Sequence, residues 1–252
     1  MKVLVNNQLI EYKDEGLGRV LLLLHGWGTD LTTFNQLSSH LSKEFRVIRF
    51  DFPGFGQSPE PDDSWLVEDY SRLTCDLLKK LKIERVYAII GHSFGGRVII
   101  KGVSQGYLNP EKVVLIGSAG IKPNNTLKKS VFKSIAKVGK VTTSLPGINK
   151  LQPHLRKQLY TSAGSQDYLN AKQMQGTFAK VVDEDLLPFV PKIAQPTLLI
   201  WGENDTETPV SDAVKIDLSL ASSDLKIIPN AGHFVYNDAY EKVVEYLDGF
   251  LC

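Results

Sequence analysis

Residues 86–100 read VYAIIGHSFGGRVII. The first five residues form an apolar run typical of a buried strand, and residues 97–100 begin a helical pattern. Between them, Gly91-His92-Ser93-Phe94-Gly95 matches the pattern G-x-S-x-G, in which a serine lies at a sharp turn from strand to helix. The flanking glycines avoid the clashes that side chains would cause at such a turn. The segment therefore predicts that the Ser93 hydroxyl is exposed at the carboxyl end of a strand, above a helix amino terminus.

A glycine-rich turn between a strand and a helix also occurs in nucleotide-binding folds. In that interpretation Ser93 would have no chemical role. However, neither G-x-x-x-x-G-K-[ST] nor G-x-G-x-x-G is present in the segment. The pattern therefore favours a serine nucleophile over a phosphate-binding loop.

Short apolar runs alternate with helix-length segments along most of the chain. The expected strands are residues 3–5, 9–12, 20–24, 47–50, 86–90, 113–116, 197–201 and 225–228. The central runs are apolar at every position, which is typical of parallel strands covered on both faces. Helical patterns cover residues 33–41, 70–81 and 240–251. This order predicts a doubly wound α/β sheet, mostly parallel, with an antiparallel hairpin at its amino terminus.

The alternation breaks between about residues 121 and 191, where proline and glycine punctuate helical patterns and strand-like runs are missing. Residues 121–180 contain eleven Lys or Arg and one acid, Asp167, so this segment carries +10 and the remaining residues carry −9. The break in the alternation and the change in charge both indicate an insertion. We expect a core domain made of residues 1–120 and 192–252, and a helical cap at residues 121–191.

The expected cap contains an amphipathic pattern from Thr126 to Lys140. Four aliphatic residues fall on one helical face, and five lysines fall largely on the other. The apolar face could roof an acyl pocket while the lysines form a solvated face. The lysines could instead steer an anionic substrate or place the helix on an anionic membrane surface. The pattern leaves these three interpretations open.

Two further loops carry an acid and a base. Asp205 ends the motif Trp201-Gly202-Glu203-Asn204-Asp205 after an apolar strand, and His233 lies in Asn230-Ala231-Gly232-His233-Phe234 after the last strand. Each has an ordinary explanation, because Asp is common in turns and a loop histidine is usually solvated. Their chain order after Ser93 is that of one hydrolase fold. We therefore predict Ser93, Asp205 and His233 as catalytic residues.

A fourth loop, Leu24-His25-Gly26-Trp27-Gly28, follows the strand at residues 20–24. In a fold of this kind, a backbone N–H after that strand completes an oxyanion hole. We assign the two donors to the N–H groups of Trp27 and Phe94, which are also the expected substrate-binding positions. His25 is expected to hold its loop by hydrogen bonds and to have no catalytic role.

Together these motifs resemble those of the α/β-hydrolase superfamily over nearly the whole chain. The resemblance rests on His25–Gly28, on Asp51-Phe52-Pro53-Gly54-Phe55-Gly56-Gln57-Ser58, on the Ser93 turn and on the Asp205 and His233 loops. In size and motifs the chain is similar to small bacterial carboxylesterases and to meta-cleavage-product C–C hydrolases. The family implies an eight-stranded sheet, a Ser-His-Asp triad and no cofactor, with Asp51 in a structural loop. Serine at position 93 departs from epoxide hydrolases and haloalkane dehalogenases, which need a carboxylate nucleophile there.

Composition and charge narrow the class of protein further. The 252 residues are 42% hydrophobic, as in ordinary globular proteins. Twenty-nine Lys or Arg against twenty-eight Asp or Glu argue against a nucleic-acid partner. Cys75 and Cys252 cannot form a disulfide framework and fit a reducing compartment. Neither a targeting segment nor an integral membrane segment is recognisable, so we expect a cytoplasmic protein.

These patterns predict a cofactor-independent serine hydrolase, without a metal, that cleaves a small-molecule carboxylic ester or thioester through an acyl-enzyme. One alternative is a C–C bond hydrolase of the meta-cleavage-product type, which can use the same triad. Another is a receptor-like protein that has kept the fold and lost turnover, because a fold alone does not give a function. The patterns make no prediction of the oligomeric state.

Overall fold

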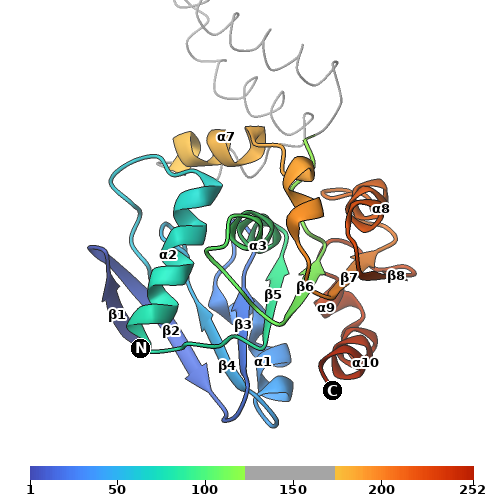
Figure 1. Ribbon diagram of the computed structural model, residues 1–252, viewed down its shortest axis with the longest axis horizontal. Helices are drawn as coiled ribbons and strands as arrows, with labels where there is room; N and C mark the ends of the chain where they lie inside the picture. Colours follow the sequence, from blue (N-terminus) through green and yellow to red (C-terminus); the bar gives the residue numbers. More distant parts are fainter. Residues whose placement is uncertain (123–173) are drawn as a thin grey trace, which may run out of the picture.

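The computed structural model describes residues 1–122 and 174–252, and its strands form one eight-stranded sheet (Figure 1). The strands are β1 (Lys2–Val5), β2 (Gln8–Glu15), β3 (Val20–Leu24), β4 (Arg46–Phe50), β5 (Ala88–His92), β6 (Lys112–Ile116), β7 (Thr197–Gly202) and β8 (Ser223–Ile228). Their order in the sheet is β1-β2-β4-β3-β5-β6-β7-β8. β2 pairs antiparallel with β1 and β4, whereas all other neighbours are parallel. The mostly parallel sheet and its amino-terminal hairpin are therefore as predicted.

The strand before Ser93 lies two residues later than its apolar run indicates. β5 covers Ala88–His92 instead of residues 86–90, because Gly91 pairs with Leu24 of β3 and His92 pairs with Ile116 of β6. A glycine and a histidine give no strand signal in the sequence. Because β5 extends to His92, the turn at Ser93 follows the strand without an intervening loop.

Helices cover both faces of the sheet. They are α1 (Asn35–Leu41), α2 (Val67–Lys80), α3 (Phe94–Ser104), α7 (Gln175–Asp183), α8 (Val210–Ser219), α9 (Val235–Asp238) and α10 (Tyr240–Leu251), with 3₁₀ helices η1 (Leu31–Phe34) and η4 (Leu187–Lys192). The predicted helix at 70–81 begins earlier, at Val67, because Asp69 Oδ2 accepts the Leu66 N–H at 2.8 Å and caps the first turn. The predicted helix at 33–41 starts as η1 and becomes α-helical at Asn35.

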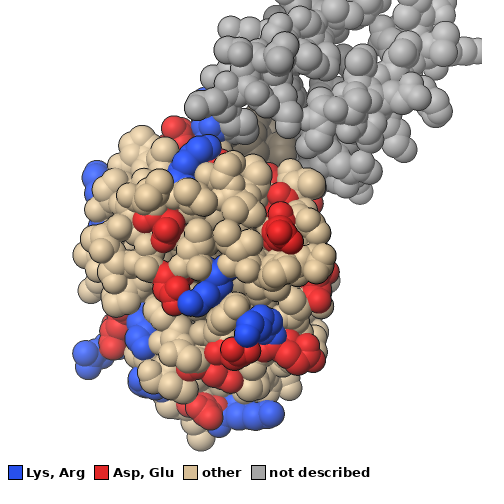
Figure 2. Space-filling view, turned by 90° about the vertical axis from the view of Figure 1, so that its right-hand side faces the viewer, with Lys and Arg blue, Asp and Glu red and all other residues tan. Residues whose placement is uncertain are grey.

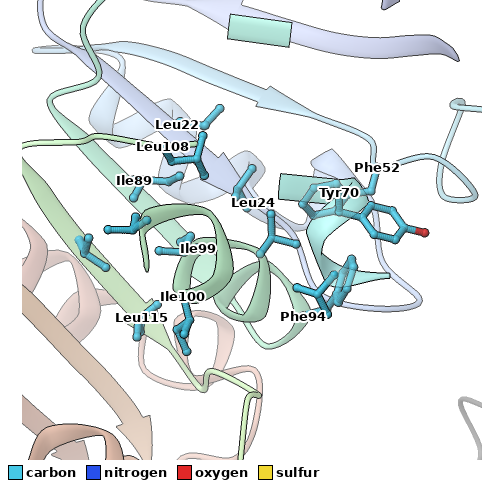
Figure 3. Packing of buried hydrophobic residues seen from close by; sticks show 14 of the residues in the cluster. Leu22, Leu24, Phe52, Tyr70, Ile89, Phe94, Ile99, Ile100, Leu108 and Leu115 are labelled. Atoms are coloured by element: carbon cyan, nitrogen blue, oxygen red, sulfur yellow. The ribbon is translucent and has the colours of Figure 1, made fainter. Parts of the chain in front are cut away.

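The hydrophobic core has two parts, one on each face of the sheet. Along β3, Leu22 and Leu24 point to the face covered by α2 and α3, whereas Leu21 and Leu23 point to the face covered by α1 and α10. This alternation follows from the two-residue period of a strand. Figure 3 shows the first part, in which side chains of α3 pack against those of the central strands. The core thus fixes α3, the helix that begins after Ser93, against the middle of the sheet.

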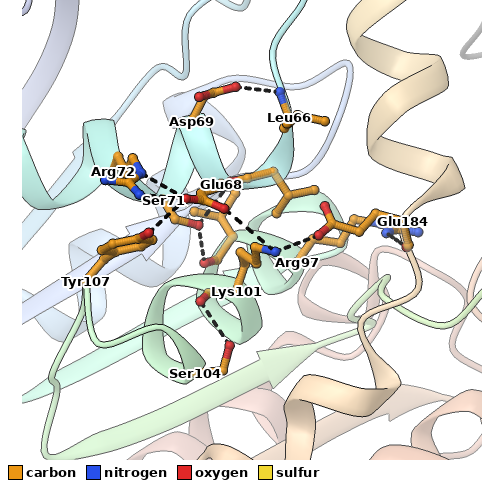
Figure 4. Close-up of polar contacts among 12 residues, drawn as sticks. Leu66, Glu68, Asp69, Ser71, Arg72, Arg97, Lys101, Ser104, Tyr107 and Glu184 are labelled. Atoms are coloured by element: carbon orange, nitrogen blue, oxygen red, sulfur yellow. Dashed lines mark hydrogen bonds and ion pairs between the residues drawn. The ribbon is translucent and has the colours of Figure 1, made fainter.

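A polar network ties α3 to α2 and to the segment that follows α7 (Figure 4). Lys101 Nζ of α3 donates to Glu184 Oε1 at 2.8 Å, and Arg97 Nη1 donates to the Glu184 carbonyl oxygen at 2.9 Å. Glu68 of α2 accepts a hydrogen bond from Tyr107 and lies 4.0 Å from Lys101 Nζ. Burial lowers the pKa of Arg97 to about 10, so its guanidinium stays charged at neutral pH. The network holds the chain leaving α7 on the helix of the Ser93 turn.

The predicted cap lies partly outside the described residues. The amphipathic pattern from Thr126 to Lys140 falls there with its lysines, so the three interpretations of that pattern stay predictions, as does the domain division at residues 121–191. Within that range the structure describes α7 and η4, and Figure 1 shows α7 above α2 and α3. None of the described helices combines the length and apolar character needed to cross a bilayer.

Figure 2 shows the side of the molecule that lies on the right in Figure 1, where α8, β8 and α10 are found. Positively and negatively charged side chains are mixed on this face. Acidic and basic groups lie side by side there, as in the ion pairs Lys215–Asp212 and Lys226–Asp224. A surface of mixed sign is typical of a face in contact with water. The predicted site residues lie elsewhere, at the carboxyl ends of the strands.

Candidate active site

Ser93 occupies a strained turn between β5 and α3. Its backbone has φ +50° and ψ −108°, a conformation that residues with a Cβ rarely adopt and that costs about 1–3 kcal/mol. Three backbone hydrogen bonds hold the turn: Ser93 N–H donates to Ile116 O at 3.1 Å, and Ser93 O accepts from Gly96 N and Ala119 N, each at 3.0 Å. The Ser93 residue is partly exposed. The strained geometry is therefore maintained by the ends of β6 and α3.

The glycines on either side of Ser93 are required by close packing. A Cβ at Gly95 would lie 2.1 Å from the Leu24 carbonyl oxygen, and a Cβ at Gly91 would lie 2.5 Å from Ile99 Cδ1. Both distances are far shorter than van der Waals contact. The G-x-S-x-G pattern thus lets α3 pack directly on the end of β3.

Asp205 and His233 meet at the carboxyl ends of β7 and β8. Asp205 Oδ2 accepts a hydrogen bond from His233 Nδ1 at 2.8 Å, and both side chains are buried. Burial on its own raises the pKa of Asp205, but the hydrogen bonds from His233 and Thr208 outweigh it and hold the pKa below its ordinary value. The carboxylate is therefore ionised at neutral pH. With Nδ1–H facing this carboxylate, the neutral ring has its acceptor lone pair on the other nitrogen, Nε2.

Thr208 is a further member of this group, and the sequence reasoning missed it. Its N–H donates to Asp205 Oδ1 at 2.8 Å, and its hydroxyl lies 2.8 Å from Asp205 Oδ2 and 3.3 Å from His233 Nδ1. Trp201 Nε1 of β7 donates to the Thr208 carbonyl oxygen at 2.7 Å and so anchors the Asp205–Thr208 loop to the strand. The signal in the sequence is a threonine three residues after an aspartate, a spacing at which the carboxylate can accept local N–H and O–H bonds.

The His233 loop packs against the Ser93 turn through His92. The rings of His92 and His233 have centroids 4.7 Å apart, and His92 Nε2 lies 3.0 Å from the His233 carbonyl oxygen. His233 Nε2 also lies 3.4 Å from Glu207 Oε2, an exposed carboxylate of the Asp205 loop. The structure therefore brings the predicted base next to the residue that precedes the predicted nucleophile.

The predicted oxyanion loop touches the same turn. A Cβ at Gly26 would lie 2.8 Å from His92 Nδ1 and 3.4 Å from Ser93 Cβ, so the loop backbone is in contact with the turn. The Trp27 ring packs edge-on against Phe94 at 5.4 Å between centroids. Phe94 is the first residue of α3, where helix N–H groups are free to bind an anion. These contacts bring the Trp27 and Phe94 segments together next to Ser93.

The side chain of Phe94 is part of the core. It is 2% exposed and packs among Phe52, Tyr70 and Leu24 (Figure 3). Any contact of Phe94 with a substrate is therefore expected through its backbone N–H and not through its ring. Trp27 is only partly buried. The assignment of both residues to substrate binding stays a prediction.

His25 and Asp51 have the structural contacts expected of them. His25 Nδ1 donates to Gly26 O at 2.7 Å and its Nε2 accepts from Phe52 N–H at 3.0 Å. Burial lowers the pKa of His25 to about 4, so the ring is neutral. Asp51 accepts the N–H groups of Leu31 and Gln57, both at 2.7 Å. Across residues 1–122 and 174–252, no group of three or more His, Cys, Asp or Glu side chains is arranged to hold a metal ion.

The model of the α/β hydrolase family matches residues 21–246, so the chain belongs to this family. The 2-hydroxy-6-oxo-6-(2'-aminophenyl)hexa-2,4-dienoic acid hydrolase of Metapseudomonas resinovorans is 27% identical over 238 residues, covering 88% of this chain and 80% of that protein. An uncharacterized protein of Mycobacterium bovis is 26% identical over 268 residues, and the match covers 95% of this chain and 77% of that protein. The structure of an esterase from Exiguobacterium antarcticum has a TM-score of 0.77 at 24% identity. The match covers 99% of this chain and 98% of the esterase, which shows a shared fold.

Proposed function

We propose that the protein is a cofactor-independent serine hydrolase that cleaves a small carboxylic ester or thioester. The observation that carries the proposal is the 2.8 Å hydrogen bond between Asp205 Oδ2 and His233 Nδ1, formed beside the strained turn at Ser93. An ionised carboxylate, a buried imidazole and a serine at a sharp turn are the components of acyl-transfer catalysis. In this proposal Ser93 is the nucleophile, His233 the general base and Asp205 the residue that orients the base.

The first half of the proposed reaction forms an acyl-enzyme. Ser93 Oγ attacks the acyl carbonyl carbon while His233 Nε2 takes the hydroxyl proton. Asp205 stabilises the imidazolium that results. The N–H groups of Trp27 and Phe94 bind the oxyanion, and loss of one such donor raises the barrier by about 3–4 kcal/mol. His233 then gives the proton to the departing alcohol or thiol as the bond to the acyl carbon breaks.

The second half releases the acid. His233 Nε2 takes a proton from a water molecule, whose oxygen attacks the acyl carbon of the Ser93 ester. The tetrahedral intermediate uses the same two N–H donors. His233 returns the proton to Ser93 Oγ as the ester bond breaks, and the free carboxylic acid leaves. The sequence of steps needs no cofactor.

Aromatic side chains beside the Ser93 turn favour a substrate with an apolar acyl group. The Trp27 ring contacts Phe55 at 4.8 Å and Phe178 of α7 at 5.1 Å between centroids. Met174, the residue directly before α7, also contacts the Asp51–Ser58 loop, since a Cβ at Gly54 would lie 2.5 Å from Met174 Cε. We propose that residues 121–191 act as a cap and that Phe178 forms part of the wall of the acyl pocket.

The proposal is tested with a series of p-nitrophenyl esters from acetate to laurate. We expect turnover by the wild-type protein with one optimum of chain length, and background turnover by a folded Ser93→Ala variant. Thermal unfolding of both proteins controls for the fold. Equal turnover by the two proteins would refute Ser93 as the nucleophile.

A C–C bond hydrolase is the second candidate. It is favoured by the 27% identity to the dienoic acid hydrolase of Metapseudomonas resinovorans. The same triad and oxyanion donors would serve this reaction. A coloured dienone substrate, followed by loss of its absorbance, separates the candidates: C–C cleavage with higher kcat/KM than any ester of the series would favour the second.

A further inference from the structure

His92 lies at the centre of the contacts between the three loops of the candidate site. It ends β5 directly before Ser93 and is buried. Its Nε2 is 3.0 Å from the His233 carbonyl oxygen, and its Nδ1 is 3.4 Å from the Tyr236 hydroxyl. The place where a Cβ of Gly26 would lie is 2.8 Å from His92 Nδ1. One ring therefore touches the turn of the nucleophile, the oxyanion loop and the loop of the base.

The partners of His92 define which ring nitrogen carries the proton. A carbonyl oxygen can only accept, so Nε2 must carry the hydrogen that is donated to His233 O. In the neutral ring Nδ1 is then an acceptor, and the Tyr236 hydroxyl donates to it. Tyr236 in turn lies 2.8 Å from Thr33 Oγ1, which can donate to its oxygen. The hydrogen bonds run in one direction, from Thr33 through Tyr236 and His92 to His233.

The surroundings of His92 keep its ring uncharged. Burial and the neighbouring His233 ring lower the pKa of His92 to about 3. The ring is also packed between aromatic side chains, with centroids 5.1 Å from Phe234 and 5.0 Å from Tyr236. A ring with so low a pKa takes up no proton near neutral pH, so His92 is suited to hold a partner through its N–H and not to act as a general base.

We propose that His92 is a positioning residue, whose Nε2–H holds the backbone of the His233 loop so that the His233 ring stays aligned with Ser93. The inference rests on the proposed function, because it gives His92 a role in that reaction. The His233 ring is oriented by Asp205 at one nitrogen, but a side chain also needs its own backbone fixed. His92 supplies that second restraint from the residue next to the nucleophile, so the base and nucleophile loops are joined directly.

Two substitutions separate the hydrogen bonds of His92 from its packing. His92→Phe keeps an aromatic ring but removes the donor and the acceptor. His92→Gln keeps a donor and an acceptor on a flexible chain. We expect His92→Phe to lower kcat by up to about 100-fold, because misplacement by about 1 Å can have this effect, with KM little changed. His92→Gln should recover most of the loss, and the rate of Ser93 labelling by a fluorophosphonate should follow kcat in both variants.

His40→Phe is the matched control. His40 lies on α1, half exposed, and bonds Asp248 of α10 at 2.9 Å, away from the candidate site. This variant should keep the wild-type kcat. All proteins are assayed well below their unfolding temperatures, so a loss of stability alone does not lower the rate.

A nuclear magnetic resonance measurement tests the inference without turnover. In protein labelled with ¹⁵N-histidine, the His92 ring should show a neutral Nε2–H tautomer at pH 7. An Nδ1–H tautomer, or a charged ring, would overturn the inference. So would a folded His92→Phe variant with wild-type kcat and labelling rate. Failure of the proposed function is distinguishable, because Ser93→Ala would then be as active as the wild-type protein.

Discussion

His233 Nδ1 lies 2.8 Å from Asp205 Oδ2, and the two residues come from loops at the ends of the adjacent strands β7 and β8. The distance is that of a strong, charge-assisted hydrogen bond. It depends on the parallel pairing of these strands, which brings two loops 28 positions apart in the chain to one edge of the sheet.

Replacing Asp205 by asparagine tests this bond. The amide has nearly the same shape but cannot stabilise an imidazolium, and it favours the wrong tautomer of His233. We expect kcat of Asp205→Asn to fall by about 10⁴-fold, the size of effect known for this change in a serine-hydrolase triad. Asp212→Asn is the control: Asp212 lies in the first turn of α8, is partly buried and pairs with Lys215, and this variant should keep full activity. A decrease smaller than tenfold would contradict a role for Asp205 in orienting the base.

Thr208 should contribute to both stability and rate. Thr208→Val preserves shape but leaves buried acceptors without the hydroxyl donor, so we expect a loss of about 1–3 kcal/mol in the free energy of unfolding. The kcat should fall because Asp205 loses one of its anchors, and Thr208→Ser should restore it. Urea unfolding and ester kinetics measure the two effects. A valine variant as stable and active as the wild-type protein would show that the hydroxyl is dispensable.

Gly95 should not tolerate a methyl group. Because its Cβ would lie 2.1 Å from Leu24 O, we expect Gly95→Ala to destabilise the protein by about 3 kcal/mol or more, or to prevent folding. Gly249 in α10 is the matched control, since its Cβ would meet nothing within 4 Å. There, alanine should stabilise the helix by about 0.5–1 kcal/mol. Urea unfolding of both variants gives the comparison, and equal stabilities would disprove the tight approach of α3 to β3.

Two buried histidines should make the fold sensitive to mild acid. The pKa values of His25 and His92 fall from 6.5 to about 4 and about 3 on folding. Between pH 6.5 and about 4 the unfolded chain therefore binds protons that the folded protein does not, so stability falls as pH falls. Each histidine should cost about 2 kcal/mol of unfolding free energy between pH 7 and pH 5. In the His92→Gln variant, the contribution of His92 to this loss of unfolding free energy should disappear. A flat stability profile over this range would mean that these rings are not buried and neutral.

The strands could be predicted from the sequence because buried parallel strands are apolar at every position. Several strands are longer than predicted, such as β2 and β8, and β5 lies two residues later. Gly91 and His92 belong to β5 through pairing with Leu24 and Ile116, which no local pattern reveals. The start of α2 depends on the Asp69 side chain, and the 3₁₀ turn at Leu31–Phe34 depends on Asp30, which accepts the Thr32 N–H at 2.7 Å. Such boundaries follow from single hydrogen bonds and not from periodicity.

For the candidate site, the motifs indicate the residues that we propose carry the chemistry, but not the residues that contact and support them. Ser93, Asp205 and His233 can be proposed from the sequence because their order and flanking strands form a pattern, and the structure shows the contact between Asp205 and His233. The contacts of Thr208 with Gly117 and of His92 with His233 could not be proposed in this way, because they join positions 91 and 141 residues apart in the chain. The burial of the Phe94 ring also depends on tertiary packing. From the sequence alone, an aromatic residue after a serine could equally line a substrate pocket or pack in the core.

The most direct test of the account is covalent labelling of the protein with a fluorophosphonate, read by mass spectrometry of the intact chain and of its peptides. The account predicts one label for each wild-type chain, on the peptide that contains Ser93, and no label on the folded Ser93→Ala variant. Labelling of Ser93→Ala at the wild-type rate, or a folded wild-type protein that takes no label, would contradict the assignment of Ser93 as an activated nucleophile.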